Sequence, residues 1–207
     1  HPMYRRQRQM CIRDRNKQIL KNPECTVHDI GDGVMCIEFQ TKGNSIGEGI
    51  AKGINEAIDI AEKDGWNGIV IGNNDKQFSV GANLMNMGMM AMQKNFDEIE
   101  KFLVGFQKIL MRMRTCNVPV VSATHGFVLG GGLEVSIHCD AGIHASESYI
   151  GLVEAGVGLI PGGGGTKEMA MRASDSFNSG DVKMPSLIDH FKSCLLYTSD
   201  AADDTSG

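Results

Sequence analysis

The 207-residue sequence lacks a long apolar run and has no excess of positive charge. Its longest hydrophobic stretch falls well short of the ~20 residues that a membrane-spanning helix needs. The first fifteen residues are rich in Arg and Gln and contain no apolar segment of the kind found in a cleaved secretory signal. The formal net charge is −5, and no basic stripe is present. We therefore expect neither membrane insertion nor a nucleic-acid partner.

Cysteine is present, but not in a pattern that indicates metal binding or a disulfide framework. Six cysteines occur, and those between residues 16 and 193 are Cys25, Cys36, Cys116 and Cys139. They form neither a CxxC pair nor a Cys/His cluster with zinc-ligand spacing. The sequence thus predicts no metal site, and reduced, buried thiols of the kind typical of a cytoplasmic protein.

The two ends of the sequence differ in origin, we expect, from the segment between them. MCIRDR (Met10–Arg15) and CLLYTSDAADD (Cys194–Asp204) resemble translations of the two strands of one transposon-end adapter used in DNA library preparation. The alternative is a pair of polar native tails. We expect residues 1–15 and 194–207 to be adapter-derived, and residues 16–193 to be one domain cut from a longer protein.

Between the ends, apolar runs bounded by turn residues alternate with amphipathic stretches. The expected elements are a hairpin over 26–39 around a Gly-Asp-Gly turn, helices over 50–65 and 95–114, and strands over 68–73, 118–126 and 141–145. The first helix has Gly65 as its expected C-cap. This alternation predicts an α/β fold with parallel strands buried on both faces.

Two glycine-bearing turns each follow an apolar strand: FSVGANL (Phe78–Leu84) and VLGGGLEVSIHCD (Val128–Asp140). In α/β sheets, ligands bind beyond the carboxyl ends of strands, so each turn could point a backbone N–H into one cleft. Glu134 and Glu154 lie in apolar surroundings and are candidates for acid/base chemistry. Two alternatives remain open: Glu134 could be an ordinary first-turn helix acid, and Glu154 a surface loop residue.

Three other features carry weaker signals. PGGGGTK (Pro161–Lys167) lacks the Lys directly after its last glycine that a phosphate loop requires. The Met-rich stretch 84–93 could line an acyl-chain pocket or serve ordinary helix packing. His125 and His138 are interpreted as structural residues, because no metal or nucleophile pattern accompanies them.

Taken together, FSVGANL, HGFVLGGGLEVSIHCD and YIGLVEAGVGLIPGGGGT resemble the enoyl-CoA hydratase/isomerase (crotonase) family in order, spacing and glycine positions over about Asp29–Met171. The sequence is most similar to the hydratase module of bifunctional proteins that also carry a 3-hydroxyacyl-CoA dehydrogenase module. Lys17–Pro23 would then end the linker between the modules. The resemblance implies a ClpP/crotonase-like fold, a superhelix of repeated ββα units, here without the family's C-terminal helices.

The resemblance also implies roles for individual residues. The N–H groups of Ala82 and Gly131 would bind the thioester oxygen, Glu134 would deprotonate a water molecule, and Glu154 would deliver a proton to the α-carbon. Further substrate contacts are expected at Gly81, Asn83, Leu84 and Gly130. Asn83 is a departure, since the family commonly has Asp at this position.

The function implied is hydration of a 2-enoyl-CoA to a 3-hydroxyacyl-CoA in fatty acid β-oxidation. Coenzyme A would arrive as part of the thioester substrate, no metal or redox cofactor would be needed, and only the dehydrogenase module would use NAD. The full-length protein is expected to be a homo-oligomer. The alternatives are an enoyl-CoA isomerase on the same site, or a non-catalytic acyl-CoA-binding segment. Having both acids favours the hydratase, because many isomerases of the family keep only the acid that matches Glu154.

Overall fold

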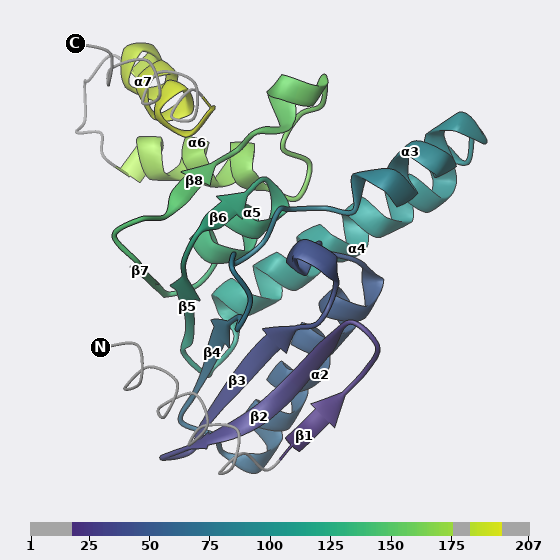
Figure 1. Cartoon of the computed structure of the whole chain (residues 1–207). Coiled ribbons are helices and arrows are strands. Elements are labelled where there is room, and N and C mark those ends of the chain that lie inside the picture. Colours follow the sequence, from purple (N-terminus) through teal and green to yellow (C-terminus); the bar gives the residue numbers. More distant parts are fainter. Residues whose placement is uncertain (1–17, 176–182, 196–207) are drawn as a thin grey trace.

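The computed structural model describes residues 18–175 and 183–195 (Figure 1). The expected adapter-derived segments therefore lie outside the described residues, except for residues 194 and 195, which end helix α7 (Lys183–Leu195). The chain forms a six-stranded sheet with helices on one side, and a second, smaller layer of strands.

The sheet begins with the expected hairpin. Strands β2 (Cys25–Gly31) and β3 (Val34–Phe39) pair antiparallel, and the turn between them has positive φ at Asp32 and Gly33. One expectation is wrong: the residues assigned to a linker include β1 (Gln18–Lys21), which pairs antiparallel with β2. QILK is too short to show a strand period, so only its pairing with β2 identifies it.

Three further strands continue the sheet in parallel, as the alternation of elements predicts: β4 (Gly68–Gly72), β5 (Val120–Thr124) and β7 (Ala141–His144). The strand order is β1-β2-β3-β4-β5-β7. Burial on both faces, however, is not general. All four residues of β7 are exposed, because β7 is an edge strand and α2 lies over β1 to β4.

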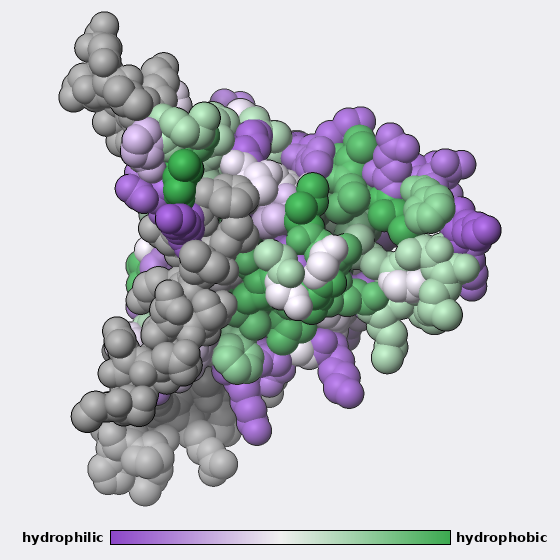
Figure 2. Space-filling view, turned by 90° about the horizontal axis from the view of Figure 1, so that it is seen from above, coloured by the Kyte–Doolittle hydropathy of each residue, from purple (hydrophilic) through white to green (hydrophobic). Residues whose placement is uncertain are grey.

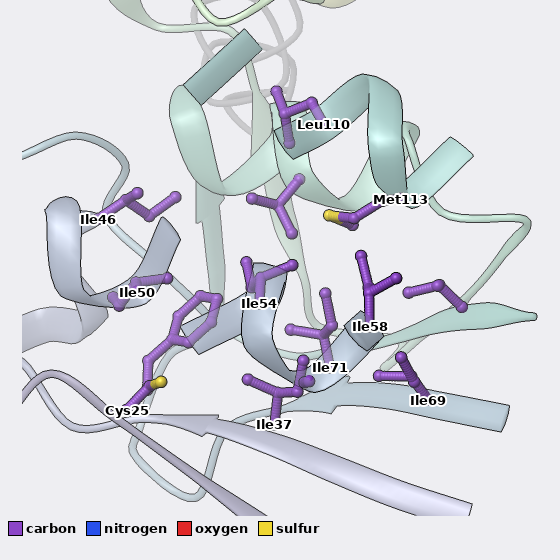
Figure 3. Packing of buried hydrophobic residues seen from close by; sticks show 14 of the residues in the cluster. Cys25, Ile37, Ile46, Ile50, Ile54, Ile58, Ile69, Ile71, Leu110 and Met113 are labelled. Carbon is purple, nitrogen blue, oxygen red and sulfur yellow. The ribbon is translucent and has the colours of Figure 1, made fainter. Parts of the chain in front are cut away.

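The core lies between this sheet and two stacked helices. Helix α2 (Glu48–Asp64) ends at Gly65, whose left-handed conformation confirms the expected C-cap. Its isoleucines face the sheet on one side and helix α4 (Phe96–Thr115) on the other (Figure 3). The fully buried contact residues are Ile50, Ile54 and Ile58 from α2, Ile37, Ile69 and Ile71 from the sheet, and Leu110 and Met113 from α4.

The second layer consists of short parallel contacts. Strands β6 (Phe127–Leu129) and β8 (Tyr149–Gly151) pair with each other, and isolated bridges join Ser79 to Val128 and Ile46 to Ala82. Helix α5 (Gly131–Ile137) follows β6, and α6 (Gly165–Asp175) follows β8. Units β5-β6-α5 and β7-β8-α6 each place one strand in the large sheet and one in the second layer before a helix, which is the expected ββα repeat. Two earlier units follow the same order with only a bridge in the second layer: β3 with Ile46 and α2, and β4 with Ser79–Ala82 and the helix Leu84–Met92.

The remaining elements connect these units: the 3₁₀ turns η1 (Lys42–Asn44) and η2 (Glu154–Val157), and helix α3 (Leu84–Met92). Helix α3 projects from the body of the molecule above α4 (Figure 1) and has no buried residue. Within the described segments, no helix combines the length and apolar character required to cross a bilayer.

Candidate active site

The two glycine turns predicted from the sequence meet in the second strand layer. Ile46 N donates to Gly81 O at 2.8 Å, and Asn83 N donates to Ile46 O at 3.2 Å, which fixes the first turn. Gly81 has φ +92°, and a Cβ there would lie 2.8 Å from Leu129 O and 3.1 Å from Gly131 N. The two backbones are thus in direct contact, at a distance that only glycine permits.

This contact brings the N–H groups of Ala82 and Gly131 together. A Cβ built on Gly131 would lie 3.3 Å from Ala82 N. The neighbouring Gly130 N donates to Gly151 O at 2.8 Å, but within the described chain neither the Ala82 nor the Gly131 N–H has an acceptor. Two adjacent, unoccupied backbone donors of this kind can bind an oxygen that gains negative charge.

Glu134 lies in the first turn of α5, yet its carboxylate points to a different segment. Its side chain is 3% exposed, and its Oε1 accepts from Gly165 N at 2.8 Å. Burial raises the pKa of Glu134, while the N–H groups of Gly163, Gly164 and Gly165 oppose that shift. A side chain at Gly163 would overlap the carboxylate. The carboxylate is therefore held by a glycine turn rather than exposed as an ordinary helix-start acid.

That glycine turn is the part of the site that sequence reasoning missed. PGGGGT resembles a phosphate loop because it presents several backbone N–H groups to one anion. Here the anion is the chain's own Glu134 carboxylate, 31 residues earlier in sequence than its partner Gly165. The run of four glycines indicated a backbone that could bind an anion, but the sequence did not show that the anion is the Glu134 carboxylate.

Glu154 begins η2 and lies against the second glycine turn. A Cβ on Gly130 would be 2.8 Å from Glu154 Oε1, and Gly130 has φ +50°. Glu154 Oε2 is buried and has no hydrogen-bond partner among the described residues. Burial, with a smaller contribution from the charge of Glu134, raises the pKa of Glu154 to about 7. These features do not fit a surface loop residue.

A cavity of about 270 Å³ opens beside the two turns. Ile46 lines it and also approaches Gly131, since its Cδ1 would be 3.5 Å from a Cβ there. Phe102 lines it from α4 and stacks on Phe106, which contacts the same glycine turn as the Glu134 carboxylate. The other lining residues are Glu24, Gly47, Glu48, Asn83, Asn86, Met87, Met90 and Ile99. The cavity thus comes near the free N–H pair through Ile46 and Asn83, but neither that pair nor the Glu134 carboxylate lines it.

Two of the predicted substrate contacts, Asn83 and Leu84, are less clearly part of the site than the glycines. Asn83 caps α3, because its side chain accepts from Asn86 N at 3.2 Å, so it has a structural task whatever it does for a ligand. Leu84 is exposed and does not line the cavity. Two methionines of the Met-rich helix, Met87 and Met90, line the cavity. Three others, Met85, Met89 and Met92, are exposed. Figure 2 shows the hydrophobic surface of the molecule seen from above.

The four cysteines whose side chains the structure describes, Cys25, Cys36, Cys116 and Cys139, do not line this cavity and are free thiols. Burial raises the pKa of Cys25 and Cys36 to about 11 and that of Cys139 to about 12, so these thiols stay protonated near neutral pH. Among the residues that the structure describes, no group of three or more His, Cys, Asp or Glu side chains is placed to hold a metal ion. Among the described titratable groups, Glu154 lies against Gly130, and both Glu134 and His138 lie against the Gly163–Gly165 turn.

The sequence of the chain is similar to those of known proteins. The family described as "Enoyl-CoA hydratase/isomerase" matches residues 29–180. A Bacillus subtilis protein named "Probable 3-hydroxyacyl-CoA dehydrogenase" is 43% identical over 73% of this chain and 19% of its own length. A Clostridium acetobutylicum short-chain-enoyl-CoA hydratase is 36% identical over 49% of this chain and 38% of its own length. The chain therefore spans well under half the length of these curated relatives.

Solved structures show the same fold. An enoyl-CoA hydratase from Geobacillus kaustophilus superposes with a TM-score of 0.66 at 24% identity, covering 84% of this chain and 68% of that one. The Bacillus anthracis enoyl-CoA hydratase gives a TM-score of 0.65 at 24% identity, over 72% of this chain and 57% of that one. The expected crotonase-like α/β fold is confirmed. By sequence and by fold, the chain belongs to the enoyl-CoA hydratase/isomerase family.

Proposed function

We propose that this site adds water to a 2-enoyl-CoA and forms a 3-hydroxyacyl-CoA. The observation that carries the proposal is the position of the buried Glu134 carboxylate and the partly buried Glu154 carboxyl group near the paired N–H groups of Ala82 and Gly131. Hydration of a conjugated thioester needs one group to accept a proton from water, one to supply a proton to carbon, and donors for the oxygen that gains charge.

The mechanism assigns each task to one group. The thioester oxygen accepts hydrogen bonds from Ala82 N and Gly131 N, which stabilise the enolate-like charge as the double bond is attacked. Glu134 takes a proton from water while the hydroxyl oxygen bonds to the β-carbon. Protonated Glu154 gives its proton to the α-carbon. With a pKa of about 7, Glu154 is protonated in a substantial fraction of molecules at neutral pH. Transfer of a proton from Glu134 to Glu154 through solvent restores the starting state.

The surroundings suit a thioester with an apolar acyl chain. Gly81 lets the two backbone turns approach each other, and Gly130 lets Glu154 approach the second turn; both glycines are proposed substrate contacts because they flank the Ala82 and Gly131 N–H groups. Asn83 borders the nearby cavity. Leu84 lies next to Asn83, with its side chain exposed where it could contact the bound substrate. Met87, Met90 and Phe102 give that cavity an adaptable apolar wall for the acyl group. Neither a metal ion nor a redox cofactor enters this scheme, and coenzyme A takes part only as the thioester of the substrate.

In the proposal, residues 16–193 are part of a larger cytoplasmic, homo-oligomeric enzyme of fatty acid β-oxidation, and the segments outside them are adapter-derived. The name of the Bacillus subtilis relative supports a partner dehydrogenase module, which would use NAD. A Rickettsia felis relative, 36% identical over 64% of this chain, is named "Putative fatty acid oxidation complex trifunctional enzyme".

Turnover of crotonyl-CoA tests the proposal. A hydratase removes the absorbance of the conjugated enoyl group and forms 3-hydroxybutyryl-CoA. The isomerase alternative, which the family description also covers, would convert a 3-enoyl-CoA to a 2-enoyl-CoA without adding water. Saturable binding of crotonyl-CoA without loss of absorbance would identify a non-catalytic acyl-CoA-binding segment and overturn the proposal.

A further inference from the structure

Helices α5 and α6 are joined at two points on adjacent turns. At the first, Glu134 Oε1 accepts from Gly165 N at 2.8 Å. At the second, one helical turn further along α5, His138 Nε2 lies 3.2 Å from Lys167 Nζ. Because Glu134 and His138 are four residues apart, they lie on the same face of α5. A carboxylate held at one point can pivot, whereas a second contact fixes the orientation of the segment that holds it.

The hydrogen bonds of His138 define which nitrogen carries its proton. Nδ1 lies 2.7 Å from Glu134 O, and a carbonyl oxygen can only accept, so Nδ1 donates. Nε2 then has a lone pair that accepts from Lys167 Nζ. His138 is fully buried, and burial lowers its pKa, which favours the neutral ring. The other charged groups facing the ring are Glu168, whose Oε2 is 4.0 Å from Nε2, and Arg114, which is hydrogen-bonded to Glu168.

The imidazole ring also supports the glycine turn itself. Gly164 has φ +127°, and a Cβ there would lie 3.3 Å from His138 Cε1 and 3.4 Å from Nε2. The turn that surrounds the Glu134 carboxylate therefore packs against the ring on its other side. With no side chains of their own, Gly163–Gly165 depend on such contacts to keep one conformation.

We propose that His138, fixed by Lys167, is a positioning residue for Glu134: it holds the Gly163–Gly165 turn in the conformation that directs its N–H groups at the carboxylate. The packing of His138 against the Gly163–Gly165 turn does not depend on a catalytic role for Glu134. Its expected effect on turnover, however, rests on the proposed function. His138 touches no reacting atom, so its influence passes through the turn.

Kinetics provide the first test, using the 207-residue chain and crotonyl-CoA. Lys167 is exposed, so Lys167→Met removes the donor to His138 with little risk to folding. We expect kcat to fall by about 10- to 100-fold with KM within about twofold, because a 1 Å displacement of a catalytic group can cost ~10² in rate. Lys167→Arg keeps an N–H donor and should recover most of the loss. Lys108→Met, at an exposed lysine of α4, is the matched control and should behave as the unmodified chain.

The second test reads the Glu134 carboxyl directly and needs no activity. The carboxyl carbon of ¹³C-labelled Glu134, assigned by its loss in Glu134→Gln, is titrated by NMR. Backbone N–H donors favour the charged carboxylate, so a loosened turn raises the pKa of Glu134. His138→Asn changes no charge and keeps a donor near the Nδ1 position, yet loses the acceptor for Lys167. We expect an upward pKa shift in this variant. If His138→Asn does not fold, Lys167→Met at about 1 M salt, where exposed charges are screened, replaces it.

The two readouts separate the two hypotheses. An upward pKa shift with unchanged turnover in the active chain would support the positioning contact and contradict the catalytic role of Glu134. A pKa of Glu134 that does not move overturns the positioning role, whatever happens to kcat. A fall in kcat that Lys167→Arg does not recover, without a pKa shift, would also count against it.

Discussion

At the scale of single residues, the two acids differ in how they are held. The carboxylate of Glu134 receives backbone N–H groups, which favour its charged form, whereas Glu154 Oε2 is buried and has no hydrogen-bond partner among the described residues. Burial raises the pKa of both, but the value of about 7 belongs to Glu154. Two carboxyl groups with different environments suit a base and an acid, respectively.

Replacing either acid by its amide should lower turnover. Glu134→Gln and Glu154→Gln keep the side-chain shape and remove proton transfer, so we expect kcat for crotonyl-CoA hydration to fall by ~10²–10⁴, with KM little changed. Loss of hydration with 3-enoyl-CoA isomerisation retained in Glu134→Gln would show that Glu154 alone can shuttle protons. Hydration by Glu134→Gln at the unmodified rate would contradict the two-carboxylate mechanism.

Glu154 should also make folding stability depend on pH. Its pKa is raised from 4.5 to about 7 in the folded chain, so the folded state binds more protons than the unfolded state between these values. Stability from this group is present below about pH 4.5 and is lost as the pH rises through about 7. The loss is at most about 3 kcal/mol and is reduced by solvent, because Glu154 is only partly buried.

Urea unfolding of the unmodified chain and of Glu154→Gln at pH 5, 6, 7 and 8 measures this effect. The free energy of unfolding of the unmodified chain should decline with pH relative to the variant. Both proteins contain Glu134, so any pH dependence of stability that comes from Glu134 cancels in the comparison. Parallel profiles for the two proteins would rule out a raised pKa for Glu154.

At the scale of elements, local patterns were sufficient where the determining contacts are local. The Gly31–Gly33 turn predicted the β2–β3 hairpin, and the apolar stripe with Gly65 predicted α2. The sequence could not predict β1, the exposure of β7, or the hold of Gly163–Gly165 on Glu134, because each depends on a partner distant in the chain. The proximity of Ala82 and Gly131 was expected from the family resemblance, and backbone packing at Gly81 accounts for it.

The contact between the two glycine turns can be tested at Gly81. Gly81→Ala places a Cβ 2.8 Å from Leu129 O at a φ of +92°, so the Ala82 N–H must move away from Gly131. We expect a stability loss of about 1–3 kcal/mol and a fall in kcat. Gly88→Ala is the matched control: in α3 a Cβ at Gly88 meets nothing within 4 Å, and we expect stabilisation of up to about 1 kcal/mol with normal turnover. Equal kcat in both variants would show that the close approach at Gly81 is not required.

At the scale of the whole molecule, the two strand layers explain why the site forms between repeats. Each ββα unit adds a strand to the large sheet, and the segments at Ile46, Ser79–Ala82, β6 and β8 lie beside one another in the second layer. The free N–H groups come from two successive units, and Glu154 comes from the next. The site therefore requires these units to be stacked in register, and an end segment that contributes no strand to the large sheet should be dispensable.

Removal of the end segments tests this requirement together with their expected adapter origin. Deleting residues 1–15 and 194–207 shortens α7 by two residues at its end, where helices commonly fray, and removes none of the strands that the structure describes. Since the sequences of these segments are polar and offer few apolar side chains to bury, we expect the Tm and crotonyl-CoA turnover to stay within error. The control is a deletion of residues 1–21, which also removes β1 and leaves the edge of β2 unpaired. That control should lower the Tm clearly. A comparable loss of Tm in the shorter deletion would show that the end segments belong to the folded domain.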